Sequence, residues 1–371
     1  MQPEDEKILI IPTDTDAQPL DTGAAVRALL DQISRTGDQI SRAAAARLAA
    51  LADQISAAEP AKTEADTAEA EAAAMTLQPL PISKGVQFPL DKVSSTLCEI
   101  PPGQVVPLKA ESDADAAKGL TANILVSLNA KPGSGFSLDN PLTDYEMRAL
   151  FAAMGIYHDA ETHAQQTGGA IECVFTVNQL FDRMGGETCP GARQRERLES
   201  ALDSLLCTLI TIDNRDERRI YPDRPAAFYR TQLLQGGYAG YITRGGLDAR
   251  AIRIDKKPVL LEFAERRDNI CTVPLDVFRD GENMTDRSLA TAHYLIRRIA
   301  HMKNAPKLSR TVRFETLAGA VIRATGADAQ KFGRKQRVRL ADSVKNKLTH
   351  YRKCGWIRGF SIGGDAVHID I

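Results

Sequence analysis

The stretch RKQRVRLADSVKNKLTHYRK, residues 334–353, predicts a single helix. It contains neither Gly nor Pro, and its apolar residues recur every three or four positions. At about 100° per residue, the face opposite this stripe is positive or hydrogen-bonding, with Asp342 at its edge. The predicted stripe consists of Val338, Ala341, Val344, Leu348 and Tyr351, and the predicted polar face of Lys335, Arg339, Ser343, Asn346, Lys347, His350 and Lys353.

The segments on either side of this helix indicate a winged helix-turn-helix. A helical stretch, TLAGAVIRA (316–324), precedes it and ends at Gly326. After it come Gly355 and two short β-like runs, 356–362 and 366–371, which are separated by Gly363-Gly364 as in a hairpin. If this order of elements is a winged helix, the helix that enters the DNA major groove is residues 334–353. Alternatively, a basic exposed helix face is often only a solvated surface.

The distribution of charge favours a polyanionic partner. From Met284 to Ile371 there are 18 Lys and Arg against 6 Asp and Glu, a net charge of +12. The first 75 residues carry 6 basic and 14 acidic residues, a net charge of −8, and the whole chain is at −1. A nearly neutral chain with one strongly basic end is typical of a protein that binds nucleic acid through that end.

Length and composition allow two or three domains in 371 residues. There is no run of about 18 apolar residues, and the acidic start is unlike a secretory signal, so no membrane contact is expected. The six cysteines are scattered without a CxxC, which favours free thiols in the cytoplasm. Neither His nor Cys has metal-site spacing, so no metal and no cofactor are predicted.

The N-terminal third differs from the rest. Residues 22–58 have an apolar seam with steps of three and four and three copies of Asp-Gln-Ile-Ser, which predicts a short coiled coil or, alternatively, a loose helix. Residues 61–75 are an acidic, low-complexity linker. From 76 to 107 the chain is rich in Pro and short β-like runs, which favours extended segments with little helix.

A similar order of elements occurs twice, at about 142–256 and 270–371. The first series begins with a helix capped by Thr143 and continues with a strand, a short helix capped by Thr176, a long helix (192–209) and a strand–turn–strand wing at 208–222. We therefore predict an α+β chain with two tandem winged helix-turn-helix domains after an acidic helical or disordered extension. The predicted domains are 1–75, 76–256 (first winged helix with a β-rich lead-in) and 257–371 (second, basic winged helix).

The chain resembles the replication initiator (Rep) proteins of plasmids and mobile elements in both series. In the first series the resemblance lies in PLTDYEMRALFAAM, FTVNQLFDRMG and ARQRERLESALDSLLCTLITID, and in the second in VPLDVF and ATAHYLIRRIAHMKN. The resemblance covers about residues 120–371. It implies binding to repeated origin sites, opening of the adjacent duplex and recruitment of host helicase and primase. It also implies base contacts from the second winged helix, and a homodimer or monomer–dimer equilibrium through the first.

The residue types on the basic helix indicate how it would read double-stranded DNA. Arg339 could form a bidentate pair with guanine and Asn346 with adenine. Lys335, Lys347 and Lys353 could neutralise phosphates, as could the flanking arginines and Arg358 in the wing. The predicted DNA-binding set is Arg334, Lys335, Arg337, Arg339, Ser343, Asn346, Lys347, His350, Lys353 and Arg358, with a weaker contact from Arg193 and Arg197, which could equally lie on a dimer or solvent face.

The sequence favours no enzyme and no catalytic residue. There is no His-x-His metal motif of a rolling-circle nickase, no G-x-x-x-x-G-K-[ST] phosphate loop and no G-x-S-x-G. Three functions stay open: a replication initiator, a winged-helix transcriptional regulator or partition protein, and an oligomeric scaffold whose basic end binds nucleic acid without sequence preference.

Overall fold

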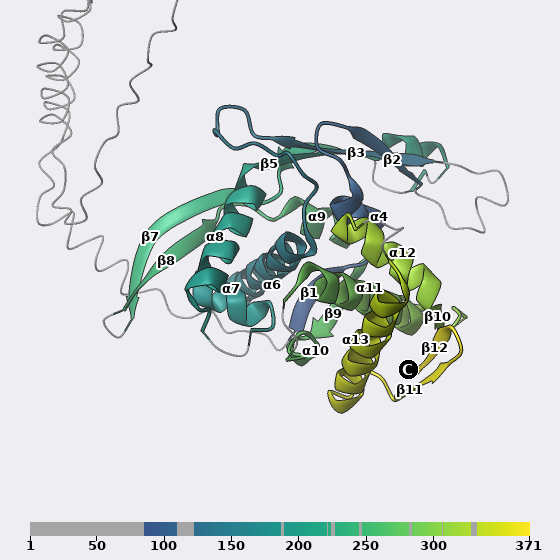
Figure 1. Cartoon of the computed structure of the whole chain (residues 1–371). Coiled ribbons are helices and arrows are strands. Elements are labelled where there is room, and N and C mark those ends of the chain that lie inside the picture. Colours follow the sequence, from purple (N-terminus) through teal and green to yellow (C-terminus); the bar gives the residue numbers. More distant parts are fainter. Residues whose placement is uncertain are drawn as a thin grey trace, which may run out of the picture. The chain divides into compact units, whose positions relative to one another are not determined.

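The chain divides into two compact units, Met1–Thr76 and Leu77–Ile371. The computed structural model describes residues 85–109, 122–186, 189–220, 222–223, 227–244, 247–281, 284–305, 307–327 and 332–371, with the side chains of 240–250 excepted. The coiled coil predicted at 22–58 and the linker at 61–75 lie outside the described residues. Within the second unit the fold is a mixture of helices and small antiparallel sheets (Figure 1).

The second half of this unit follows the predicted element order. Helix α11 (Asp286–Asn304) leads to strand β10 (Thr311–Arg313), helices α12 (Phe314–Thr325) and α13 (Arg334–Lys353), and the hairpin β11 (Gly359–Gly363) and β12 (Ala366–Asp370). The strands form an antiparallel sheet in the order β10-β12-β11. The predicted bounds of α13 are confirmed, and Gly364, at the hairpin turn, has a φ of +57° that favours glycine.

The first half repeats this arrangement, with its hairpin at a different place from the predicted wing. Its elements are α6 (Asp144–Thr167), β4 (Cys173–Thr176), α7 (Val177–Arg183), α8 (Ala192–Cys207), β7 (Gly236–Arg244) and β8 (Leu247–Ile254). The sheet order β4-β8-β7 matches β10-β12-β11, because in each case the short first strand pairs with the last strand of a hairpin. The repeat that the sequence indicated through element order is therefore also a repeat of strand pairing.

The strand–turn–strand wing predicted at 208–222 is wrong. Strand β5 (Thr208–Asp213) is present, but Arg215–Arg219 forms a 3-10 helix, η2. Strand β5 joins β2 (Val105–Lys109), β3 (Asn123–Ala130) and β6 (Phe228–Gln232) in a sheet of order β2-β3-β5-β6. Every second residue of β5 is buried, and two of these three residues lie opposite buried residues of β3. The buried side chains of both strands therefore face the same side of this sheet.

The remaining short elements connect the two halves. Strand β1 (Gly85–Pro89), which precedes the first series, pairs antiparallel with β9 (Ile270–Pro274), which precedes the second. Helices α9 (Val259–Glu265) and α10 (Leu275–Phe278) contact this pair. Helix α4 (Lys92–Thr96) contacts β2, and the 3-10 helix η1 (Leu97–Glu99) contacts α12. Of the extended segments expected before residue 107, β1 and β2 are strands, whereas 92–99 is helical. Helix α6 contacts β1 and α11, and both halves contribute to one hydrophobic core.

No described helix combines the length and apolarity that crossing a membrane requires.

The start of α6 has the cap that the sequence predicts. The Thr143 side chain accepts a hydrogen bond from the Glu146 backbone N–H (3.4 Å), and the Glu146 carboxylate accepts one from the Thr143 N–H (2.6 Å). Thr143→Ala removes half of this capping box and is expected to lower the free energy of unfolding by about 1 kcal/mol in urea titrations. Gln166→Ala, at the exposed other end of α6, should stay within about 0.5 kcal/mol of wild type. Equal stability of the two variants would contradict the capping contribution.

Candidate nucleic-acid interface

Helix α13 buries one face against α11 and α12 and exposes the other. Its buried residues are Leu340, Val344, Lys347, Leu348 and Tyr351. Tyr351 also meets the buried ring of Trp356 edge-on, with centroids 5.3 Å apart. These contacts fix the rotation of the helix and therefore decide which side chains reach solvent.

The observed buried face is rotated from the predicted one. Val338, predicted as core, is 54% exposed, whereas Leu340, absent from the predicted stripe, is buried. The spacing Leu340, Val344, Leu348 and Tyr351 also fits a helical stripe, so periodicity alone allowed both rotations. The exposed face of α13 in the structure, called the basic face below, comprises Arg334, Lys335, Arg337, Val338, Arg339, Asp342, Lys345, Asn346, Arg352 and Lys353.

Lys347 does not belong to the basic face, so its prediction as a phosphate contact is wrong. The Lys347 side chain is 1% exposed. Its ammonium lies 2.5 Å from the Asp280 carboxylate and donates to the Ser288 hydroxyl at 3.0 Å. A buried ammonium requires a buried carboxylate as a partner. The charge of Lys347 is therefore paired inside the protein and does not face DNA.

His350 and Ser343 also lie at the edge of the basic face. Nε2 of His350 is 2.6 Å from the backbone carbonyl of Asp276, and 3.4 Å from the thiol of Cys354. The imidazole is half-buried and directed at α10, and its predicted contact with DNA stays a prediction. Ser343 is half-buried, and its place in the predicted set stays a prediction.

Two cations of the basic face were missed by the sequence analysis. Lys345 and Arg352 are exposed on the same side of α13 as Val338 and Asp342. The rotation centred on Leu340 would have revealed them, because it moves Lys345 and Arg352 outward and Lys347 inward. Asp342 then moves from the edge of the polar face to its middle.

The wing and α12 extend the surface next to the basic face. Arg358 is exposed at the start of the wing, and its backbone N–H donates to Asp370. A groove of about 600 Å³ runs between α12, the first half of α13 and the hairpin turn. Its walls include the exposed Val338 and Ile362, and Arg334 and Arg337 line it as well.

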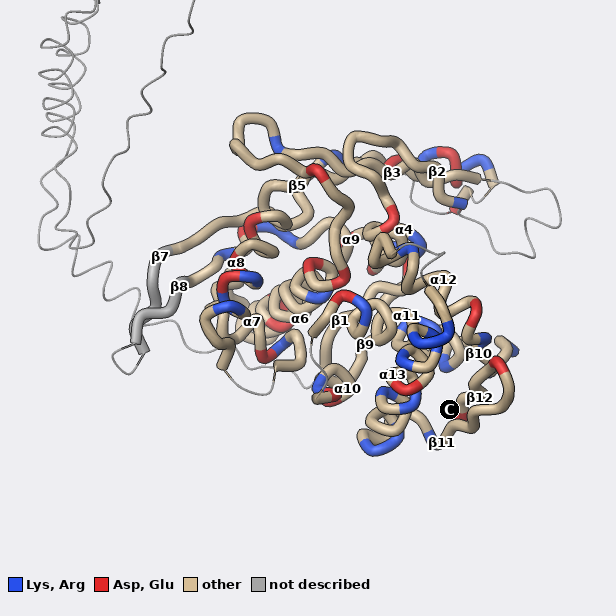
Figure 2. The backbone as a smooth tube through the Cα atoms, in the orientation of Figure 1, with Lys and Arg blue, Asp and Glu red and all other residues tan. Residues whose placement is uncertain are grey.

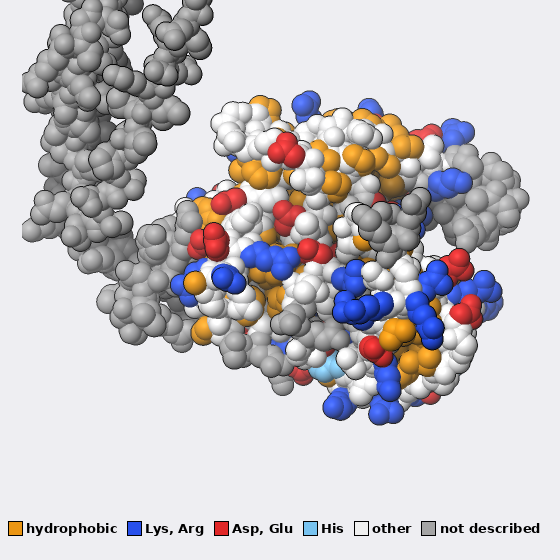
Figure 3. Space-filling model, viewed as in Figure 1, with side chains coloured by type: hydrophobic (Ala, Val, Ile, Leu, Met, Phe, Trp, Pro, Cys, Tyr) orange, Lys and Arg blue, Asp and Glu red, His pale blue; other side chains and the backbone are white. Residues whose placement is uncertain are grey.

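Lys and Arg recur along α13 and around α11 and α12 when the backbone is coloured by charge (Figure 2). The space-filling view shows basic side chains around an apolar patch on this part of the surface (Figure 3). The arrangement therefore offers phosphate-binding cations around a surface that can contact bases or deoxyribose.

The two arginines predicted on α8 have different surroundings. Arg193 is exposed near the start of α8, and its predicted role stays a prediction. The guanidinium of Arg197 donates to the backbone carbonyl of Met284 (2.9 Å) and to the Asp286 carboxylate (2.8 Å), and it lies 3.9 Å from the centre of the Tyr145 ring. Arg197 thus connects α8 to the start of α11 while its side chain stays 43% exposed, and its predicted role stays a prediction.

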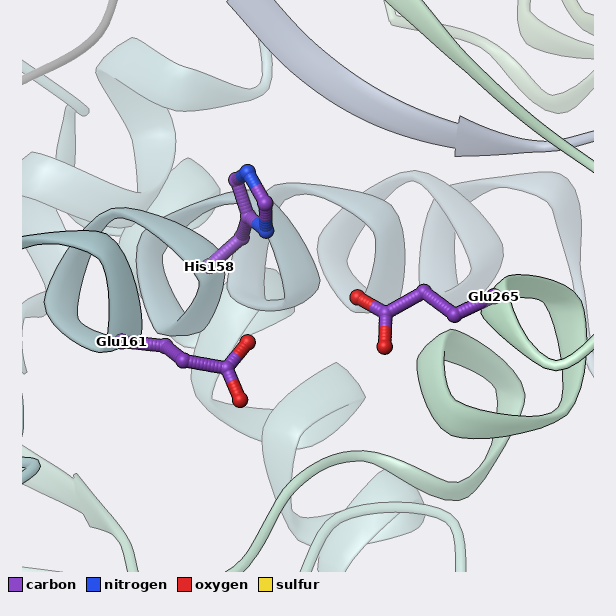
Figure 4. A group of neighbouring side chains, drawn as sticks. All are labelled: His158, Glu161 and Glu265. Carbon is purple, nitrogen blue, oxygen red and sulfur yellow. The ribbon is translucent and has the colours of Figure 1, made fainter. Parts of the chain in front are cut away.

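A group of possible metal ligands, His158, Glu161 and Glu265, lies between α6 and α9 (Figure 4). The ammonium of Lys257 lies 2.9 Å from the Glu161 carboxylate and 2.5 Å from that of Glu265. These contacts raise the pKa of Lys257 above its ordinary value, although burial of the ammonium acts in the opposite direction. The two carboxylates therefore already share a cation, and a metal ion would have to compete with it.

No family model and no curated protein matches the chain. Among solved structures, it is similar to a crystal structure of selenomethionine derivatives of domains 2 and 3 of RctB, with 11% sequence identity and a TM-score of 0.43, over 76% of this chain and 100% of that one. A second crystal structure of RctB domains 2-3 gives 11% identity and a TM-score of 0.37, over 73% of this chain and 84% of that one.

Proposed function

We propose that this protein is a sequence-specific DNA-binding replication initiator of a plasmid or mobile element. In this proposal two winged helices bind repeated origin sites as a homodimer or in a monomer–dimer equilibrium, without a chemical step, in the cytoplasm, and the bound protein recruits host helicase and primase. The basic face of α13 is the observation that supports DNA binding. The role in initiation rests on the resemblance of the chain to the Rep proteins.

The dimensions of α13 suit a major groove. Twenty residues at about 1.5 Å each give a helix roughly 30 Å long, and the major groove of B-DNA admits one helix. Arg339 and Asn346 lie seven residues apart, which is close to two helical turns, so both face the same side. Each can form a bidentate contact, Arg339 with guanine and Asn346 with adenine.

Two further side chains on the basic face fit base edges better than phosphates. Val338 is apolar and exposed, and an apolar side chain in the groove can contact the methyl group of thymine. Asp342 would be repelled by phosphates but can accept a hydrogen bond from the amino group of cytosine. Both lie between the cations of the basic face, as expected where phosphate contacts position a helix and other contacts provide specificity.

Nuclease footprinting of the DNA upstream of the gene tests this proposal. We expect wild type to protect several regularly spaced sites and Arg339→Ala/Asn346→Ala to lose sequence preference, because each bidentate pair contributes about 1 to 3 kcal/mol of discrimination. The matched control is Arg230→Ala/Asn129→Ala, which removes one Arg and one Asn exposed on the β2-β3-β5-β6 sheet and should leave the footprint unchanged.

The other outcomes separate the alternatives. A single protected operator would indicate a transcriptional regulator or partition protein and contradict an initiator of repeated sites. Binding without any sequence preference, lost at moderate salt, would indicate a scaffold with a basic end. No protection at any salt concentration would contradict DNA reading by α13 altogether.

A further inference from the structure

Residues 276–281 and 284–288, called the junction segment below, connect the first half of the unit with α13. The segment includes most of α10 and the start of α11. Helix α10 lies between α7 and α13 (Figure 1). The junction segment is bound on one side by α13 and on the other by α6, α7 and α8.

The C-terminal half of α13 is held by the junction segment at two positions. The Lys347 ammonium lies 2.5 Å from the Asp280 carboxylate. Three residues later on the same side of the helix, Nε2 of His350 lies 2.6 Å from the backbone carbonyl of Asp276. Asn346, which could pair with adenine, directly precedes Lys347. A shift of the junction segment therefore moves the part of α13 that carries Asn346.

The first half of the unit binds the same segment through two ion pairs. Arg279 donates to the Asp182 carboxylate of α7 at 2.5 Å. Arg197 of α8 donates to the Asp286 carboxylate at 2.8 Å and to the backbone carbonyl of Met284 at 2.9 Å. Both pairs are half-exposed, so each contributes little to the free energy of unfolding. Charge-assisted hydrogen bonds are directional, however, and therefore fix where the joined segments lie.

Tight packing beside α7 leaves the junction segment little freedom. Gly185, which follows α7, approaches Phe278 so closely that a Cβ atom would lie 2.1 Å from the Phe278 carbonyl oxygen. The buried guanidinium of Arg148 in α6 lies 4.1 Å from the centre of the Phe278 ring. Because packed interiors transmit strain, a shift at the ion pairs is carried to Asp280 and to α13.

We propose that the junction segment positions α13 for base reading, with Asp182 and Asp286 as positioning residues that do not contact DNA themselves. This inference rests on the proposed function, because it concerns how α13 reads bases. The bidentate contacts of Arg339 and Asn346 need aligned hydrogen bonds, which weaken steeply when the helix shifts. Phosphate contacts from long, flexible lysines tolerate the same shift. Loosening the junction segment therefore lowers sequence discrimination and not the affinity for DNA in general.

The test compares the dissociation constant (Kd) for a labelled duplex that contains the protected site with that for a scrambled duplex. In Asp182→Ala/Asp286→Ala we expect the ratio of the two Kd values to fall about fivefold. The affinity for the scrambled duplex should be unchanged or higher, because the substitutions remove two negative charges. Asp182→Glu/Asp286→Glu keeps both carboxylates and should retain most of the wild-type ratio. An unchanged ratio in the alanine variant would overturn the proposal.

Asp255→Ala/Glu262→Ala is the matched control. Asp255 pairs with Arg253 and Glu262 with Arg266, at partly exposed positions outside the junction segment. The control changes the net charge by the same amount, so its ratio should stay at the wild-type value. An equal fall in the control would assign the effect to charge alone and overturn the positioning role.

Hydrogen exchange of the free protein separates this inference from the proposed function. We expect the backbone amides of residues 344–353 to exchange faster in Asp182→Ala/Asp286→Ala than in wild type, and those of β3 and β5 to exchange at the wild-type rate. Equal exchange in α13 would overturn the positioning role. A wild type without sequence preference would contradict the proposed function instead, because the exchange of α13 is measured without DNA.

Discussion

Lys347→Ala is expected to lower the free energy of unfolding by about 3 to 5 kcal/mol, among the largest effects of any single substitution on the basic helix. The substitution leaves the Asp280 carboxylate, which is 11% exposed, without the ammonium 2.5 Å away. It also removes the buried stem of the lysine and the hydrogen bond to Ser288. Urea unfolding measures the loss, which arises from a buried carboxylate that loses its ammonium partner rather than from the net value of the pair.

Lys345→Ala is the matched control, because Lys345 lies two residues earlier in the same helix and is exposed. It should change stability by no more than about 0.5 kcal/mol while weakening DNA binding. The double variant Lys347→Met/Asp280→Leu removes both charges and should recover most of the lost stability. If Lys347→Ala were as stable as Lys345→Ala and yet lost DNA affinity, Lys347 would be a DNA contact and its burial would be wrong.

Local signals in the sequence were enough to define most elements. The bounds of α13 and the caps at Thr143 and Thr176 depend on residues within a few positions of one another, and the structure confirms them. Capping and amphipathicity are local properties, so they survive tertiary packing.

The predictions failed where contacts between segments distant in the sequence determine which side chains are buried and which strands pair. The rotation of α13 depends on Asp280 and Ser288, which accept Lys347 into the interior, and no periodicity within α13 shows those partners. Strand β5 was assigned to the first wing because it precedes a charged turn, yet it pairs with β3, about 80 residues earlier in the chain. Arg197 is exposed, as the sequence predicts, yet its guanidinium donates to Met284 and Asp286 in the other half of the unit, and no local signal shows those partners. In the first two cases long-range pairing overrode a correct local signal.

The contact between Asp144 of α6 and His293 of α11 could not be predicted for the same reason. Asp144 belongs to the first turn of α6, where an acidic residue is typical of a helix start, and His293 lies on the buried side of α11. Only the packing of α6 on α11 places the two side chains 2.6 Å apart. A histidine on an apolar helix face gives no indication of its partner until the opposing helix is known.

The salt dependence of DNA binding is expected to change most when the exposed lysines of α13 are removed together. Each phosphate contact contributes about 0.9 to the slope of log K against log salt concentration, so Lys335→Ala/Lys345→Ala/Lys353→Ala should make the slope shallower by roughly 2.7. Between 50 and 200 mM salt, wild type should then lose roughly 40-fold more affinity than the variant. Fluorescence anisotropy with a labelled duplex that contains the protected site measures both slopes.

A second triple variant separates local contacts from overall charge. Lys109→Ala/Lys131→Ala/Lys256→Ala removes the same three charges from exposed positions outside α13, so the net charge of the two variants is equal. If the basic face contacts phosphates, this control keeps the wild-type slope, because counterions are released only where cations touch the backbone. Equal changes in both variants would mean that DNA responds to the charge of the whole chain, and an unchanged slope in the α13 variant would mean that these lysines do not contact phosphates. A shallower slope in the α13 variant together with the wild-type slope in the control is the result expected of a helix held in the groove by Lys335, Lys345 and Lys353.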